Sequence, residues 1–256
     1  MIENQKYPIL EFDPNKNSVI NPHEIIKPID IPEYCVITFF KDVIAEYVKE
    51  NKATQITSLR CETMDLPIYE TEINDRKICL VQGFLGAAGA AGFLEEMIAL
   101  GIKKFIVCGG AGVLRRDIAA GHIILPDAAI RDEGLSYHYV KPGREISADE
   151  HAIAVIEQEF IERNITYIKG KTWTTDAFYR ETKDKIALRV SEGCLCVEME
   201  ASAFMAVAQF RKVILGQILY GGDDVSGDEW DSRRWQSRGD IRRALVELSM
   251  EICLKL

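Results

Sequence analysis

The chain has 256 residues, of which 47% are apolar and 28% charged, and a formal net charge of -9. This apolar content supports a sizeable core and excludes a disordered chain, while the acidic balance argues against nucleic acid and anionic membranes as partners. No apolar run reaches the roughly 18 residues that a membrane-spanning helix needs, and the N-terminus lacks the basic and apolar regions of a signal peptide.

The seven cysteines and four histidines are scattered along the chain, without a C-x-x-C pair. This spacing predicts no structural zinc site, and we expect neither a metal nor an organic cofactor. Several cysteines lie in apolar runs, where cysteine acts as a small hydrophobic residue. Because a disulfide framework is not indicated, we expect a protein of the reducing cytoplasm.

Prolines at positions 8, 14, 22, 28 and 32 predict that residues 1–33 form an extended arm. From residue 34 onward, apolar runs of strand length alternate with segments of helical periodicity. The predicted strands are 34–40, 54–61, 77–82, 104–108, 122–125, 128–131, 165–172, 195–197 and 213–220. The predicted helices are 42–50, 87–100, 148–163, 183–190, 201–210 and 239–256. This alternation predicts a single α/β domain at 34–256, with a mostly parallel, twisted central sheet flanked by helices.

Two glycine-rich turns follow neighbouring predicted strands, at 83–92 (G-F-L-G-A-A-G-A-A-G) and 109–112 (G-G-A-G). Ligands bind at the carboxyl ends of strands in such sheets, and the backbone N–H groups of these turns can bind an anion or a sugar there. The first turn lacks the G-x-G opening of dinucleotide-binding folds. Tight helix–sheet packing accounts for Gly89 and Gly92 equally well.

Three further segments place candidate functional residues at strand ends. Segment 173–182, W-T-T-D-A-F-Y-R-E-T, offers aromatic rings for stacking on a base, although such rings are more often core. Segment 197–201, V-E-M-E-A, offers carboxylates that can bind sugar hydroxyls or simply favour a helix N-terminus. Segment 219–227, L-Y-G-G-D-D-V-S-G, carries two adjacent aspartates that predict either a general acid, since their repulsion raises one pKa, or a turn.

In this order and spacing, the segments resemble the nucleoside phosphorylase family, which includes uridine phosphorylase, hexameric purine nucleoside phosphorylase and methylthioadenosine nucleosidase. The resemblance covers roughly residues 34 to 250, and T-T-D-A-F-Y followed by V-E-M-E-A is its most specific part. It implies a phosphorylase/hydrolase-like fold that binds a nucleoside. It also implies a homodimer or a higher oligomer, up to a hexamer.

The resemblance also implies roles for individual residues. The base would stack on Phe178, with Thr175 beside it. The ribose would be held by Glu198, Met199 and Glu200, with Glu200 bridging its 2′ and 3′ hydroxyls. Asp223 would be the acid at the leaving base, or Asp224 if the alignment shifts by one residue.

The acceptor site departs from the family pattern. Residues 37–43 read I-T-F-F-K-D-V, where the phosphorylases carry a G-D-P-x-R phosphate loop, and Val107 stands where they carry an arginine. Phosphate, if it is the co-substrate, would then be bound by Arg60, which the resemblance implies comes from a neighbouring subunit, by the Gly110 backbone, or by arginines of a segment that also suits a solvated helix start. Those arginines are Arg233, Arg234 and Arg238.

We therefore expect a nucleoside phosphorylase-like pentosyltransferase that cleaves the N-glycosidic bond of a purine or pyrimidine nucleoside. Two alternatives stay open. One is a nucleosidase that uses water because the phosphate loop is missing, and the other is a non-catalytic nucleoside-binding protein. Retention of Glu200 and Asp223 argues against the second, since a protein that only binds needs no acid at the base.

Overall fold

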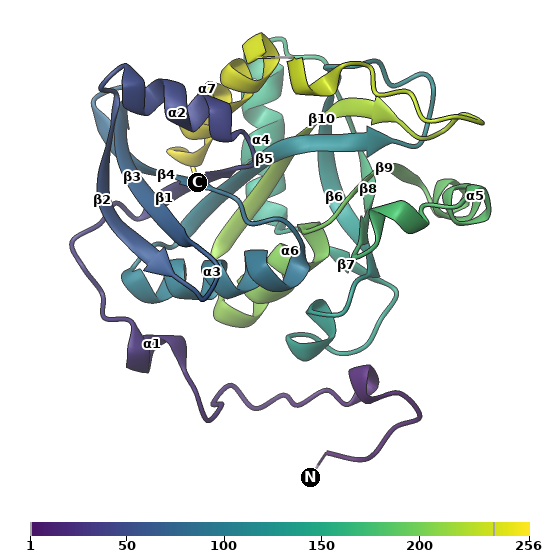
Figure 1. Cartoon of the computed structure of the whole chain (residues 1–256), viewed down its shortest axis with the longest axis horizontal. Coiled ribbons are helices and arrows are strands. Elements are labelled where there is room, and N and C mark those ends of the chain that lie inside the picture. Colours follow the sequence, from purple (N-terminus) through teal and green to yellow (C-terminus); the bar gives the residue numbers. More distant parts are fainter. Residues whose placement is uncertain (1, 238) are drawn as a thin grey trace.

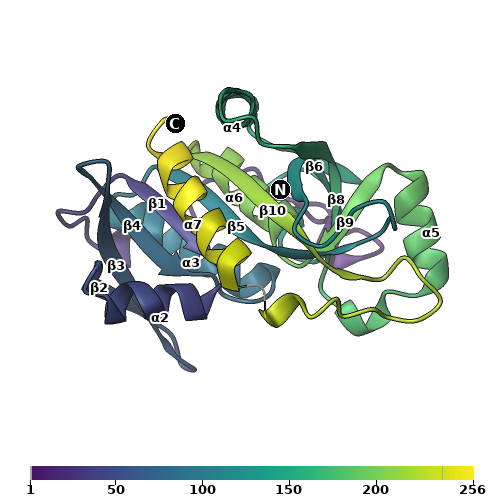
Figure 2. The same ribbon diagram turned by 90° about the horizontal axis from the view of Figure 1, so that it is seen from above.

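The computed structural model describes residues 2–237 and 239–256. It is an α/β structure in which a large twisted sheet lies between two groups of helices (Figures 1 and 2). The strands are β1 (Tyr34–Thr38), β2 (Ala53–Arg60), β3 (Asp65–Ile73), β4 (Arg76–Gln82), β5 (Lys104–Val113), β6 (Ile123–Asp132), β7 (Glu145–Ser147), β8 (Tyr167–Thr175), β9 (Cys194–Glu198) and β10 (Ile214–Asp224).

The helices alternate with these strands along most of the chain. They are α1 (Pro22–Ile25), α2 (Lys41–Lys49), α3 (Ala87–Leu100), α4 (Glu150–Glu162), α5 (Lys183–Ser191), α6 (Ala201–Arg211) and α7 (Gly239–Cys253). Four 3₁₀ turns accompany them: η1 (Pro8–Leu10), η2 (Ser136–His138), η3 (Phe178–Arg180) and η4 (Trp235–Ser237). The predicted α/β fold with a helix-flanked sheet is confirmed.

The sheet is mixed, whereas the sequence analysis predicted mostly parallel pairing. Strands β1, β4, β5 and β10 pair in parallel, but β2, β3 and β4 form antiparallel hairpins, and β9 runs against β5. The order is β10-β6-β8-β9-β5-β1-β4-β3-β2, and β10 pairs with β5 as well as with β6. Five strands therefore close into a ring at one end of the sheet.

Two local features differ from the predicted elements. The separate strands expected at 122–125 and 128–131 are one strand, β6, in which the register against β8 shifts between Pro126 and Ala128. A bulge lets a strand include a proline, which has no N–H for the ladder. Strand β3 was not predicted, although its first part, 65–71, pairs with β2 and its last part, 68–73, pairs with β4.

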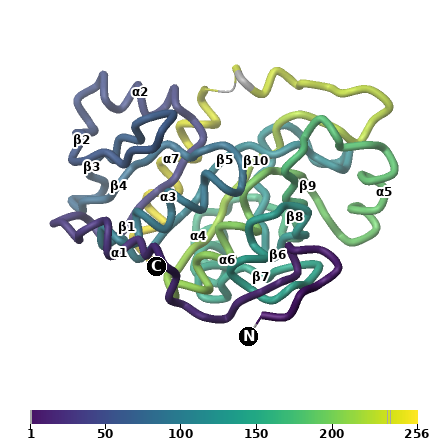
Figure 3. Tube along the Cα trace, turned by 60° about the horizontal axis from the view of Figure 1, so that its bottom comes forward, coloured from purple at the N-terminus to yellow at the C-terminus, as the bar shows by residue number. Residues whose placement is uncertain are grey.

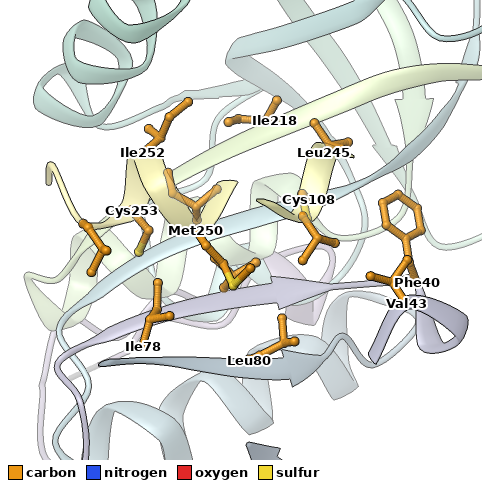
Figure 4. Packing of buried hydrophobic residues seen from close by; sticks show 14 of the residues in the cluster. Phe40, Val43, Ile78, Leu80, Cys108, Ile218, Leu245, Met250, Ile252 and Cys253 are labelled. Atoms are coloured by element: carbon orange, nitrogen blue, oxygen red, sulfur yellow. The ribbon is translucent and has the colours of Figure 1, made fainter. Parts of the chain in front are cut away.

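Apolar clusters on the two faces of the sheet hold the helices in place. On one face, α2 and α7 pack on β1, β4, β5 and β10. Figure 4 shows this cluster, in which Leu245, Met250 and Cys253 of α7 lie over Cys108, Ile78 and Leu80 of the sheet. On the other face, α3 and α6 pack together against the same strands. The carboxyl ends of the central parallel strands thus lie between two helical layers.

The first 33 residues follow the surface of this body. Figures 1 and 3 show the segment, in purple, running along one edge of the molecule and away from the sheet. Ile29 N donates a hydrogen bond to Leu100 O at 3.1 Å, and Ile31 lies against Gly101, so its end is attached to α3. Within residues 2–237 and 239–256, we find no helix with the length and apolar character needed to cross a bilayer.

Candidate active site

A cavity of about 470 Å³ opens at the ends of β1 and β4, beside the middle of β5 and β10, and where α6 begins. Its wall includes Gly83 of the first glycine turn and the acidic segment before α6. It also includes Gly109 and Gly110, which lie inside β5, so the glycine turn predicted at 109–112 is wrong: this segment continues the strand. Buried polar groups and apolar surface therefore meet in one concavity, which is the usual setting of a small-molecule site.

Glu198, at the end of β9, holds the turn that leads into α6. Its carboxylate accepts hydrogen bonds from the backbone N–H groups of Glu200 (2.7 Å) and Ala201 (2.6 Å). The hydroxyls of Thr174 (2.7 Å) and Thr172 (3.3 Å) of β8 donate to its other oxygen. Burial nevertheless raises the pKa of Glu198. A carboxylate with so many internal partners fixes the position of the residues that follow it.

Glu200 is the residue just before α6, and its side chain reaches the glycine turn that precedes α3. Its Oε1 accepts a hydrogen bond of 2.6 Å from the backbone N–H of Gly86, which precedes α3. Gly86 has φ of +90°, a conformation that favours glycine. Burial first, and the neighbouring Glu198 second, raise the pKa of Glu200 to about 8. The sequence-predicted pair of carboxylates is thus brought to the cavity together with Met199.

An aromatic ring covers one side of the glycines that line the cavity. A Cβ added to Gly83 would lie 2.8 Å from the ring of Phe39, and one added to Gly109 would lie 3.1 Å from it. Glycine at both positions therefore lets Phe39 pack across the end of β4 and the middle of β5. Gly89 likewise makes room for Phe84, which lies in the turn before α3 and not on the sheet, whereas a Cβ on Gly92 would meet nothing within 4 Å.

The two aspartates that end β10 have different surroundings. Asp224 is buried and accepts hydrogen bonds from Ser226 N at 2.8 Å and from the Arg233 guanidinium, which lowers its pKa in spite of burial. Asp223 is half-buried, and its Oδ2 accepts a 2.7 Å hydrogen bond from Trp230 Nε1. Asp224 therefore anchors the following loop, while Asp223 stands at the loop's inner side.

The predicted base-binding segment follows β8. Thr175 is buried, and its hydroxyl accepts a hydrogen bond from Ala177 N at 3.2 Å. Phe178 is 47% exposed and packs against Tyr179, with ring centres 4.1 Å apart. Glu181, which sequence reasoning missed, is half-buried, and burial together with the charge of Asp223 raises its pKa to about 7. Neither Phe178 nor Asp223 is part of the wall of the cavity itself.

The predicted phosphate ligands do not all lie at this cavity. Gly110 lines it, whereas Arg60 lies on β2, 79% exposed and 3.3 Å from Asp65, so Arg60 is open to the neighbouring subunit that the prediction assigned it to. Arg233 is committed to Asp224, Arg234 is exposed, and Arg238 lies outside the described residues. The arginine that does line the cavity is Arg242 of α7, which sequence reasoning missed. Helical periodicity placed it on an amphipathic helix, but no sequence signal indicated which neighbour it would face.

An α/β chain that brings buried carboxylates, glycines and an arginine to one cavity has the architecture of an enzyme. Comparison with known proteins assigns the family: the chain belongs to the phosphorylase superfamily, whose model matches residues 33–252. It is 24% identical over 239 residues to the guanosine phosphorylase of Halorubrum lacusprofundi. The aligned region covers 88% of this chain and 94% of that protein.

Solved structures share the fold. Uridine phosphorylase from Vibrio fischeri superimposes with a TM-score of 0.73 at 20% identity, covering 94% of this chain and 100% of that one. Purine nucleoside phosphorylase from Toxoplasma gondii, in a complex with immucillin-H, has a TM-score of 0.70 at 19% identity, covering 87% of this chain and 92% of that one. The family and the α/β fold expected from the sequence are both confirmed.

Proposed function

We propose that the protein is a nucleoside phosphorylase-type enzyme that cleaves the bond between the ribose and the base of a nucleoside and transfers the ribosyl group to phosphate. The observation that carries this proposal is Glu200, a buried carboxyl fixed by Gly86 N–H at the wall of a cavity of about 470 Å³. The names of the relatives, a guanosine phosphorylase and a uridine phosphorylase, support the same class of reaction.

Ribose binding falls to the residues at the start of α6. A carboxylate accepts hydrogen bonds from two adjacent hydroxyls at once, so Glu200 would bind the 2′ and 3′ positions with Met199 against the sugar. Glu198 is less suited to bind the ribose than Glu200, because its oxygens already accept hydrogen bonds from Glu200 N, Ala201 N and two threonine hydroxyls. Its main contribution is to hold Glu200 in place.

The base would lie between Phe178 and Asp223, with Thr175 holding the turn that carries Phe178. Departure of the base leaves an oxocarbenium-like sugar and places charge on the base, so a group that hydrogen-bonds the base in the transition state speeds the reaction. Asp223 suits this role better than Asp224, whose carboxylate is engaged by Arg233 and Ser226. An acid in this position favours purines, whose ring nitrogen N7 can take a proton.

The test is a panel of purine and pyrimidine nucleosides, incubated with and without phosphate, with identification of the sugar product. We expect the wild type to release the base and form sugar 1-phosphate. In Glu200→Gln we expect the rate of base release to fall by several orders of magnitude, with an unchanged circular dichroism spectrum. Base release from no nucleoside would leave the binding-protein alternative. Free ribose formed at a rate independent of phosphate would establish a nucleosidase.

The setting of the enzyme is also proposed. All seven cysteines are free thiols, and six of them are buried, which supports a reducing compartment such as the cytoplasm. The exposed apolar residues of the N-terminal arm support self-association into at least a dimer.

A further inference from the structure

The cavity contains a cation that the family pattern does not provide for. Among the described residues that line it, Arg242 is the one with a positive charge, and its side chain is only 11% exposed. Its guanidinium lies 4.6 Å from the centre of the Phe40 ring, and Nη2 lies 2.9 Å from Asp42 Oδ1. Phe40 and Asp42 belong to the start of α2, which packs against α7 (Figure 1). Stacking and the ion pair together hold the guanidinium at the cavity wall.

A second polar group faces the same cavity. Gln217 of β10 is 3% exposed and lines the cavity, and its buried Oε1 has no hydrogen-bond partner within the described chain. Gln217 pairs with Val107 of β5, the residue that stands where the phosphorylases carry an arginine. A buried amide oxygen without a partner costs free energy unless a ligand or a water binds it. The amide oxygen is thus suited to a ligand that donates a hydrogen bond.

The segment 37–43 explains why charge has to come from elsewhere. The Phe39 ring packs over Gly83 and Gly109, so carbon covers one side of both glycines. The cavity wall also contains Gly110, Gln217 and Arg242. An oxyanion is held well by a guanidinium, whose planar N–H groups match two oxygens at once, and poorly by an aromatic ring.

We propose that Arg242 and Gln217 form the binding site for inorganic phosphate as the acceptor, an inference that rests on the proposed ribosyl transfer. Arg242 would bind two phosphate oxygens. The Gln217 amide would donate its N–H to a third oxygen and accept the O–H of hydrogen phosphate at Oε1. The cation that the family takes from the loop after the first strand comes here from α7.

The reaction at this site is balanced without a further reactant. A phosphate oxygen forms a bond to C1′ of the ribose while the bond between C1′ and the base nitrogen breaks. The electron pair of that bond leaves with the base, which takes up one proton, in sum the one that hydrogen phosphate gives up, and the products are the free base and ribose 1-phosphate. Because one arginine shared with Asp42 replaces several cations, the site has a high phosphate requirement.

The test compares Arg242→Gln and Gln217→Leu with Arg243→Gln as a matched control. Arg243 is the next residue of α7, and its guanidinium bonds Glu50 and Glu247 at the surface, away from the cavity. We expect the KM for phosphate to rise about tenfold or more in the first two variants, with the KM for the nucleoside unchanged. Arg243→Gln is expected to keep both values. Arg242→Lys, which keeps the charge but not the planar fork, is expected to fall between, and it covers the case in which Arg242→Gln does not fold.

Two results would overturn the inference. One is an unchanged KM for phosphate in Arg242→Gln, and the other is phosphate-independent formation of free ribose by the wild type. A second readout does not depend on turnover: millimolar phosphate should raise the melting temperature of the wild type and of Arg243→Gln, but not of Arg242→Gln. The two possible failures are thereby distinguished. If no nucleoside releases its base, the proposed function is wrong. If phosphate raises the melting temperature equally in all variants, the proposed phosphate site is wrong.

Discussion

The indole Nε1 of Trp230 donates a hydrogen bond of 2.7 Å to Oδ2 of Asp223. The two residues are seven positions apart, and the loop between them bends back so that Trp230 covers the carboxylate that ends β10. The same loop is tied to α5 by the ion pair between Asp228 and Lys183, at 2.7 Å. Asp223 is therefore oriented from the loop side before any base arrives.

This contact predicts the effect of Trp230→Phe, which keeps an aromatic ring and removes the N–H donor. A hydrogen bond to a charged group contributes about 1.5–3 kcal/mol, so we expect kcat for base release to fall roughly tenfold or more. The melting temperature should stay the same because Trp230 is 64% exposed. Asp228→Asn, which removes only the ion pair of the loop, is the control. Equal losses in both variants would mean that the loop, and not the hydrogen bond, matters.

Glu200 makes the stability of the ligand-free protein depend on pH. Its pKa rises from an ordinary 4.5 to about 8 on folding, so the folded state binds this proton more tightly than the unfolded state. The resulting stabilisation is fully present below about pH 4.5 and is lost as pH rises through about 8. The free energy of unfolding of Glu200→Gln, measured with urea, should therefore exceed that of the wild type by a margin that grows from pH 5 to pH 9. A constant margin would contradict the raised pKa.

Glu198 should behave as a residue of the fold. In Glu198→Ala the N–H groups of Glu200 and Ala201 lose their acceptor, and so do the hydroxyls of Thr172 and Thr174. An orphaned buried donor costs about 1–3 kcal/mol, so we expect a loss of about 3 kcal/mol in the free energy of unfolding. Urea unfolding monitored by tryptophan fluorescence measures it. A variant as stable as the wild type would leave Glu198 with no structural role.

The site illustrates what sequence patterns can establish here. Two carboxylates at a strand end next to an apolar helix predicted a polar site before α6, and that is where Glu198 and Glu200 lie. The different hydrogen-bond partners of these two glutamates could not be predicted, because they depend on β8 being the neighbour of β9. Only that order brings Thr172 and Thr174 to Glu198. Roles that depend on strand order are invisible to a local pattern.

In the fold, too, local patterns predicted some elements, and others depend on how distant segments pair. Hydrophobic runs predicted most strands, because burial on both faces makes a strand continuously apolar. Strand β3, in contrast, alternates and contains Pro67, which the local pattern disfavours. Pro67 is paired with Ser58 of β2 alone, since pairing with β4 begins at Ile68, and a proline is tolerated where a strand has a free edge. Arg242 is the corresponding case among the helices. It was predicted to be part of an amphipathic helix, yet its place in the cavity follows from how α7 packs on α2 and β1.

Glu181 predicts a pH dependence of turnover. Burial and the charge of Asp223 raise its pKa to about 7, so below pH 7 the side chain is neutral and above pH 7 it adds a negative charge near the leaving base. Charge that develops on the base is then opposed, and we expect kcat to fall as pH rises through 7.

In Glu181→Gln this fall should be absent, because glutamine stays neutral throughout. Asp184→Asn, which removes an exposed carboxylate at the start of α5, is the control and should keep the wild-type profile. The measurement is single-turnover base release between pH 6 and pH 8.5. The same falling limb in all three proteins would assign the titration to another group.

The N-terminal arm predicts the assembly state. Val19 is fully exposed, and Ile20 and Ile25 are each 69% exposed, a concentration of apolar surface that a monomer leaves in water and a second copy can bury. We therefore expect light scattering to give at least twice the chain mass of 28.9 kDa.

Replacing Val19 and Ile20 together by aspartate should shift the mass towards the monomer, because charges are poorly tolerated in a desolvated contact. Ile161→Asp, at an exposed isoleucine of α4, is the matched control and should leave the mass unchanged. A mass of 28.9 kDa for the wild type at micromolar concentration would show that the arm binds no second copy.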